Sequence, residues 1–189
     1  MFLKGSYETS PADYAEYFEW SDGNVNNEDR RGRFVTIDDG EKIRFATSDD
    51  DYILGIVSGC PGVLGDAHED DWKGRFLRDV YNSPIYEERE IEAEIDEATG
   101  EIVTPAHTDI FQVENPDYDP SQTYIGRKDR PEWSPIGMMG KLTLDDDGTC
   151  EVGGFAAPSK DGIATRGTSI NGYKVIARLD ENHIRVIFK

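Results

Sequence analysis

The sequence predicts a mainly β protein: a compact barrel-like or sandwich domain of short hairpins, with a protruding acidic β-arm and little helix. Short apolar stretches are separated by turn residues along the whole chain, which is typical of β structure. No stretch longer than about ten residues keeps the i, i+3, i+4, i+7 apolar period of an amphipathic helix. Aromatic residues are spread from end to end, so the chain should fold rather than remain disordered.

Length and charge narrow the classes of function. The chain has 189 residues, which we interpret as one domain with a real core. It carries 39 acidic against 20 basic residues and a formal net charge of -19, so nucleic acid and anionic membrane surfaces are not expected as partners. No apolar run approaches the roughly 20 residues that span a bilayer, and the first ten residues lack the apolar stretch of a secretory signal.

Several hairpins and one core strand are predicted from local patterns. Residues 33–37 and 42–46 flank an Asp-Asp-Gly turn and form the first hairpin, and residues 51–59 follow as a core strand. Residues 141–156 are predicted as a second hairpin, and residues 172–189 as a third that turns at Asp-Glu-Asn.

Residues 84–118 differ from the rest because acidic and apolar residues alternate on both sides of Thr99-Gly100. The alternation predicts a long, solvent-facing hairpin or arm. A short helix over residues 86–97 is the competing interpretation, because Glu and Ala favour helix.

Familiar catalytic and cofactor motifs are missing from the sequence. The glycine-rich segment 59–65 has no Gly-Lys-Ser/Thr, so a surface loop is favoured over a phosphate cradle. The carboxylates of 145–147 are contiguous, whereas a calcium loop spaces its ligands alternately. The three histidines are isolated in sequence, and we expect neither a metal site nor a cofactor.

The candidate catalytic residues are Asp13 and Glu16, at the start of an aromatic run. In a helix this spacing would put both side chains on one face, whereas in a strand they would point to opposite faces and meet through a bend or across chains. Two carboxylates in a partly apolar setting suit acid-base work on a peptide bond, and an Asp can also attack the carbonyl just before it. A helix cap or a solvated pair is the alternative interpretation.

Five blocks in order carry a resemblance to a known family: residues 11–24, 26–37, 50–59, 130–154 and 161–167. The chain resembles the autoproteolytic C-terminal domain of bacteriophage neck-appendage and tail-spike proteins, which is classed as a glutamic-type peptidase and an intramolecular chaperone. The resemblance runs from about residue 11 to residue 189 and is weakest over residues 84–118.

This resemblance implies a homotrimeric domain that helps an upstream β-structured spike to trimerise and then cuts itself off. It places the cleaved bond between Ala12 and Asp13, with Asp13 and Glu16 as the catalytic carboxylates. Residues 1–12 would be an upstream linker or a remnant of the spike, 13–189 the autoproteolytic chaperone domain, and 84–118 its acidic arm or insertion. The cleaved bond can follow a serine in this family, whereas Ala12 occupies that position here.

The same resemblance implies action in the host cytoplasm during phage or prophage assembly, with the domain released from, or absent in, the mature virion. Two other functions stay open. The chain could be a trimerisation or chaperone module that never cleaves, since residues 1–12 are present, or a receptor- or glycan-binding fibre tip, since aromatic residues are abundant.

Overall fold

The computed structural model describes residues 12–67, 74–121, 123–170 and 172–189. The chain divides into two compact units. The core unit combines Met1–Glu69 with Ile125–Lys189, and the arm unit is Asp70–Tyr124. Almost all regular structure in the described residues is strand, and the only helical elements there are two short 3₁₀ turns, η1 (Arg127–Asp129) and η2 (Lys160–Gly162). The predicted mainly β class is confirmed.

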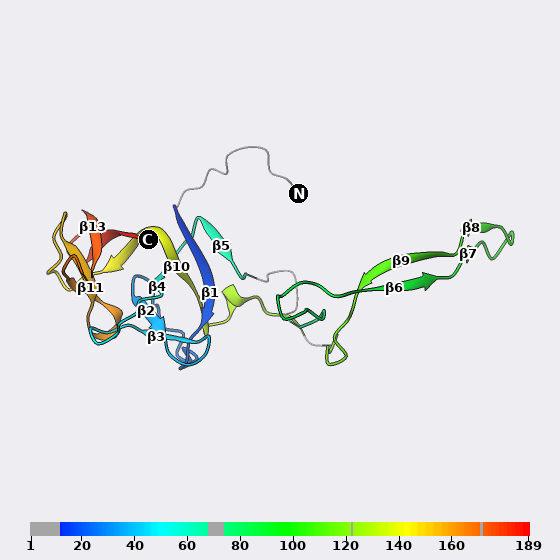
Figure 1. Ribbon diagram of the computed structural model, residues 1–189, viewed down its shortest axis with the longest axis horizontal. Coiled ribbons are helices and arrows are strands. Elements are labelled where there is room, and N and C mark those ends of the chain that lie inside the picture. Colours follow the sequence, from blue (N-terminus) through cyan, green and yellow to red (C-terminus); the bar gives the residue numbers. More distant parts are fainter. Residues whose placement is uncertain (1–11, 68–73, 122, 171) are drawn as a thin grey trace. The chain divides into compact units, whose positions relative to one another are not determined.

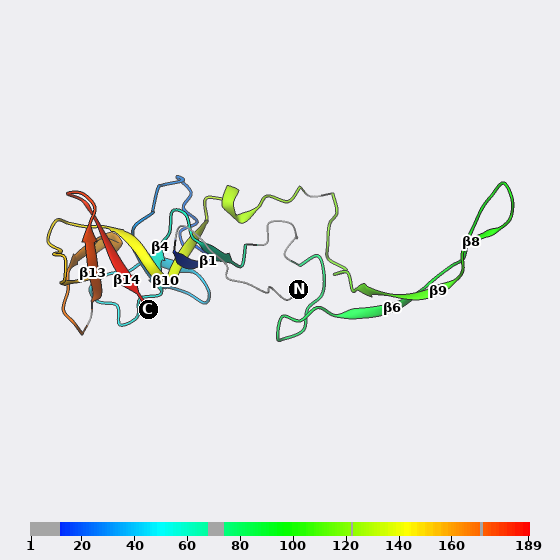
Figure 2. The ribbon, with the colours of Figure 1, turned by 90° about the horizontal axis from the view of Figure 1, so that it is seen from above.

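The core unit is built on one strongly curled sheet of ten strands (Figure 1). Eight of them follow one another in the order β12 (Ala164–Arg166), β11 (Phe155–Pro158), β13 (Tyr173–Arg178), β14 (His183–Phe188), β10 (Trp133–Asp145), β4 (Gly55–Val57), β2 (Phe34–Ile37) and β3 (Ile43–Phe45). Figure 2 shows β10, β13 and β14 side by side. Two further strands, β1 (Asp13–Glu19) and β5 (Val63–Gly65), lie off this path.

Strand β1 joins the sheet along the first half of β10, in antiparallel register from Asp13 opposite Gly140 to Glu19 opposite Trp133. Its burial alternates as expected for an extended strand: Asp13, Ala15 and Tyr17 are buried, and the residues between them are more exposed. Strand β5 then pairs with β1 in parallel. The aromatic run that begins at Asp13 is therefore a strand inside the sheet, and not a helix.

The aromatic run ends in the core. The Trp20 side chain is 1% exposed, and its indole N–H donates to the Ser134 hydroxyl at 2.9 Å. Its ring lies edge-on to Phe45 at 5.0 Å, and the Arg30 guanidinium lies 4.4 Å from the centre of the ring. These contacts fix the far end of β1, because burying a tryptophan removes a large apolar area from water.

The first and third predicted hairpins are confirmed. Strands β2 and β3 pair antiparallel around the predicted Asp-Asp-Gly turn. Strands β13 and β14 pair antiparallel around residues 179–182. The predicted core strand 51–59 is present as β4, which is shorter than expected and fully buried.

The predicted second hairpin, 141–156, is wrong. The second half of β10 pairs with β14, whereas β11 pairs with β12 and β13, so the two strands are not neighbours. The acidic residues between them hold a connecting loop instead of a hairpin turn. The Asp146 side chain is fully buried, accepts from the Arg178 guanidinium at 2.5 Å, and also accepts from the Cys150 amide at 3.3 Å.

The arm unit contains the predicted acidic hairpin. Strands β6 (Tyr86–Ile91) and β9 (His107–Gln112) pair antiparallel, and β7 (Glu94–Ile95) and β8 (Ile102–Thr104) continue the ribbon to its turn. The Asp96 carboxylate accepts from two amides of that turn. The alternative of a helix over residues 86–97 is wrong. Among the described residues, no helix is long and apolar enough to cross a membrane.

Candidate active site

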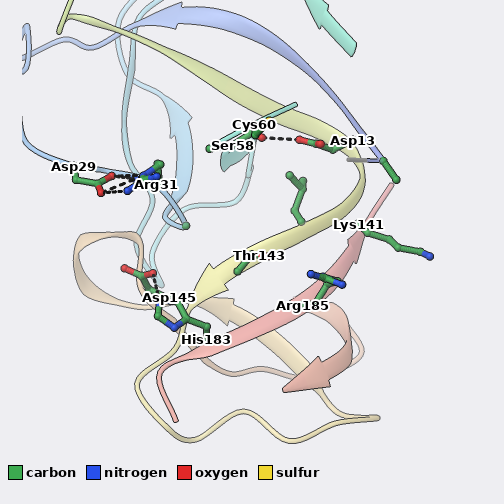
Figure 3. A pocket seen from close by; sticks show the side chains of 14 residues that line it. Asp13, Asp29, Arg31, Ser58, Cys60, Lys141, Thr143, Asp145, His183 and Arg185 are labelled. Atoms are coloured by element: carbon green, nitrogen blue, oxygen red, sulfur yellow. Dashed lines mark hydrogen bonds and ion pairs between the residues drawn. The ribbon is translucent and has the colours of Figure 1, made fainter. Parts of the chain in front are cut away.

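The Asp13 side chain is buried at the start of β1, with 5% of the residue exposed. Its carboxylate accepts hydrogen bonds from two groups. The Ser58 hydroxyl donates to Oδ2 at 2.7 Å (Figure 3), and the Gly62 amide donates to Oδ1 at 3.2 Å. The Gly62 amide also donates to the main-chain oxygen of Asp13 at 2.9 Å. Both partners are donors, and each carboxylate oxygen of Asp13 accepts one of the two hydrogen bonds.

The loop that supplies these donors, residues 58–62, is held at both ends by the sheet. Strand β4 delivers Ser58, whose amide donates to the Pro135 carbonyl of β10 at 2.9 Å. Strand β5 follows the loop and pairs with Tyr14–Glu16 of β1. The loop therefore passes beside the first residue of β1 because the strands on either side of it belong to the same sheet.

The peptide bond between Ala12 and Asp13 packs against a glycine. Gly140 stands opposite Asp13 in the register and has a φ of +113°, a region that L residues rarely adopt. A Cβ at this position would collide with the main-chain oxygen of Ala12 and would approach the Asp13 Cα to 3.0 Å. The sequence therefore needs glycine here for β10 to lie so close to this bond.

A pocket of about 1120 Å³ opens next to this bond and is lined by both Ala12 and Asp13 (Figure 3). Its wall carries charges of both signs. Arg31 pairs with Asp29 at 2.5 Å and lowers the pKa of that carboxyl to about 2, chiefly by hydrogen bonding. Lys141 of β10 and Arg185 of β14 bring two further cations to the same wall.

Neither of the two histidines that the structure describes is a hydrogen-bond partner of the Asp13 carboxylate. His183 lines the pocket wall, but its Nδ1 lies 2.8 Å from the Asp180 carboxylate. His107 is exposed on β9 of the arm unit, and His68 lies outside the described residues. Among the described residues, no group of three or more His, Cys, Asp or Glu side chains is arranged to hold a metal ion.

Glu16 lies on the opposite face of β1 from Asp13. The Tyr14 hydroxyl donates to the Glu16 carboxylate, and this hydrogen bond raises the pKa of the Tyr14 phenol. Both side chains lie over Gly65 of β5, whose Cβ position would be 2.9 Å from the Tyr14 hydroxyl and 3.0 Å from the Glu16 Cγ. The helical arrangement of Asp13 and Glu16 is therefore wrong, and the extended one, with the two side chains on opposite faces, is observed.

Sequence reasoning missed three residues of this site: Ser58, Gly62 and Gly140. The glycine-rich segment 59–65 was interpreted as a surface loop, and nothing in its pattern indicates that its neighbour Ser58 contacts Asp13, 45 positions away. Gly140 is one of 19 glycines, and only the register of β1 against β10 singles it out.

Comparison with known protein families shows which family this chain belongs to. Residues 3–182 match the family described as Peptidase_G2, IMC autoproteolytic cleavage domain. The chain belongs to this family. The match covers most of the chain, including β1, the 58–62 loop and β10. Membership in Peptidase_G2 makes the chain an autoprocessing domain of the kind found in phage appendage proteins.

Curated relatives agree with this assignment. The chain is 34% identical over 157 residues to the pre-neck appendage protein of Bacillus phage B103, and 33% identical over 159 residues to that of Bacillus phage phi29. It is 32% identical over 166 residues to the putative phage-related protein YobO of Bacillus subtilis (strain 168). These alignments cover 82%, 82% and 87% of the chain. The chain spans only 16% of the length of the two appendage proteins and 18% of YobO.

Solved structures show the same fold. The C-terminal fragment of bacteriophage phi29 gene product 12 superposes with a TM-score of 0.66 at 27% identity, covering 94% of this chain and 100% of the fragment. The pre-mature form of the same gene product gives a TM-score of 0.69 at 26% identity, covering 100% of this chain and 23% of that one.

Proposed function

We propose that this Peptidase_G2 domain cuts its own backbone once, between Ala12 and Asp13, after the phage appendage or tail-spike protein that carries it has assembled as a homotrimer. One observation carries the proposal. The carboxylate of Asp13 is buried, is held by two donors, and stands beside the bond that would be cut, at a pocket that Ala12 also lines.

The family and the length of its members support the biological role that we propose. In this proposal the domain is an intramolecular chaperone that helps the upstream β-structured spike to trimerise in the host cytoplasm. Cleavage then releases it, so that it is absent from the mature virion. The appendage proteins named above support this role, because the matching region is a small part of a much longer chain.

The chemistry is hydrolysis, and water is the co-reactant. A water oxygen forms a bond to the carbonyl carbon of Ala12 while one carboxylate takes a proton from that water. The C–N bond then breaks as a carboxylic acid gives a proton to the nitrogen of Asp13. The first products are a carboxylic acid on Ala12 and an amine on Asp13. The proton of this acid then passes to the amine, which leaves a carboxylate on Ala12 and an ammonium group on Asp13, and the proton held by the first catalytic carboxyl returns to the second. Such a reaction acts once per chain, so it needs no site for exchanging substrate.

We propose that Asp13 and Glu16 act together across two copies of the chain. Within one copy they lie on opposite faces of β1, and in this proposal a neighbouring copy brings its Glu16 to the pocket beside Asp13. Tyr14, Val63 and Met139 are exposed beside each other around the Glu16 face, at 36%, 42% and 61%, and give that copy an apolar surface. A contact between two different surfaces closes into a trimer when each copy is rotated by a third of a turn from the last.

Intact mass tests the cleavage. The unmodified chain should lose residues 1–12 on assembly, and both Asp13→Asn and Glu16→Gln should keep them, because each removes one carboxylate of the pair. A trimer of the unmodified chain that keeps its full mass through long incubation would show instead that the domain is a chaperone that does not cleave.

A mixing experiment tests the pairing across copies. Asp13→Asn and Glu16→Gln chains that carry different tags are expressed together and compared with each expressed alone. Each variant alone should stay intact. In equimolar mixed trimers about half of the Glu16→Gln chains should be cut, because their own Asp13 then meets a Glu16 from a neighbour. If both chains stay intact in mixed trimers, the two carboxylates work within one chain.

A further inference from the structure

We infer that Ser58 is a positioning residue for this cleavage: its hydroxyl, together with the Gly62 amide, holds the Asp13 carboxylate aimed at the water that attacks the Ala12 carbonyl. The inference rests on the proposed function and deepens it, because it assigns Asp13 the role of proton acceptor. The proton on the departing nitrogen then comes from Glu16 of a neighbouring copy.

The first step of the argument is burial. Asp13 and Ser58 are 5% and 7% exposed, so their hydrogen bond of 2.7 Å is shielded from water. A carboxylate removed from water is unfavourable unless donors replace its hydration. Each oxygen of Asp13 receives one protein donor, and each keeps a further lone pair that can accept a proton from water.

The second step is alignment with the bond that is cut. The amide of Gly62 donates both to the Asp13 carboxylate and to the Asp13 main-chain oxygen, so one loop fixes the side chain and the backbone together. On the other side, Gly140 lets β10 pack directly against the Ala12 carbonyl. A general base must lie within hydrogen-bond reach of the water that it activates, and this double anchoring restricts where Asp13 can place its free lone pairs.

The third step separates the side chain of Ser58 from its backbone. The Ser58 amide donates to the Pro135 carbonyl at 2.9 Å and keeps the loop attached to β10. Alanine at position 58 retains this bond and removes only the hydroxyl. The loop should therefore stay in place while the carboxylate loses one of its two donors.

The test is a time course of cleavage of the full 189-residue chain made by cell-free synthesis and followed by intact mass at several pH values. We expect Ser58→Ala to slow cleavage roughly 10- to 100-fold, because misplacing a general base reduces its contribution by that order. Ser58→Thr, which keeps the hydroxyl, should restore most of the rate.

Thr36→Val is the matched control. The Thr36 hydroxyl is also buried, at 4% exposure of the residue, and donates to the Tyr52 carbonyl at 2.6 Å, away from Asp13. This variant should lower the melting temperature by a few degrees and leave the cleavage rate and its pH profile unchanged.

Two results would overturn the inference alone: an unmodified chain and Ser58→Ala that cleave at equal rates across the pH range, or a Thr36→Val that is slowed as much as Ser58→Ala. An assembled unmodified chain that never loses residues 1–12 would overturn the proposed function, and the role of Ser58 with it.

Discussion

At the scale of single residues, the close packing of β10 against the bond between Ala12 and Asp13 depends on Gly140, which has no side chain. Gly140 has no Cβ, and its φ of +113° is unfavourable for any other residue. The missing Cβ and the positive φ both matter at Gly140, since an added Cβ would also collide with the Ala12 carbonyl oxygen. The geometry of the site therefore depends on glycine at position 140 as well as on the carboxylate of Asp13.

Replacing Gly140 by alanine should stop or strongly slow cleavage and lower the free energy of unfolding by about 2 kcal/mol or more, because backbone strain and a collision add. Gly148→Ala is the control: Gly148 has a φ of +90° but no atom within 4 Å of its Cβ position. It should share the backbone strain and still cleave. Urea unfolding and intact mass measure the two effects, and equal cleavage by both variants would remove the role given to Gly140.

At the scale of elements, an ion pair between Arg44 and Asp50 links β3 to the turn that follows it. The Arg44 guanidinium lies 2.6 Å from the Asp50 carboxylate, which also accepts from the Thr47 amide at 2.7 Å. The hydrogen bond from Arg44 is the largest cause that lowers the pKa of Asp50 to about 2, against an ordinary value of 3.8. This pair contributes stability above pH 3.8, and the contribution is lost as the pH falls from 3.8 towards 2.

Asp50→Asn should therefore lower the free energy of unfolding at pH 7 by about 1 to 2 kcal/mol, a value reduced because Arg44 is partly exposed. The difference from the unmodified chain should shrink as the pH falls from 4 and be mostly lost near pH 2. Urea unfolding at several pH values measures it. Asp49→Asn, at the exposed neighbouring position, is the control and should show no such trend. A constant difference down to pH 2 would contradict the assignment.

Elements closed by a local turn could be predicted from the sequence, whereas the remote pairings could not. The hairpins β2–β3, β13–β14 and β6–β9 each lie in one continuous stretch, so alternation and turn residues were sufficient. Strand β10 pairs with β1, β4 and β14 instead of the next strand along the chain, and no local pattern encodes that choice. The same holds for the site. Family resemblance indicated Asp13, but its contact with Ser58 arises because β1 and β4 both pair with β10, and no local pattern predicts that pairing.

At the scale of the whole molecule, the chain leaves and re-enters the core unit at two positions that contact each other. The Arg127 guanidinium donates to both the main-chain oxygen and the carboxylate of Asp66, and it lies 4.0 Å from the centre of the Trp133 ring. The side chain of Arg127 is 1% exposed, so this contact is part of the core unit. Asp66 and Arg127 both belong to the core unit, so their contact does not depend on the residues of the arm unit.

Replacing residues 70–124 by a short Gly/Ser linker should therefore leave the core unit folded. Asp66 and Arg127, which lie three and two residues from the ends to be joined, already contact each other, and the free energy of closing a flexible loop changes only slowly with its length. The shortened chain keeps Trp20 and Trp133 of the core unit and loses Trp72, so tryptophan fluorescence and near-UV circular dichroism report on the core unit alone. We expect a cooperative melt within about 5 °C of the full chain, since the deleted residues form a separate compact unit. The same deletion combined with Arg127→Ala should melt lower, because the closing contact is then lost. A shortened chain without a cooperative melt would show that the core unit needs the arm unit to fold.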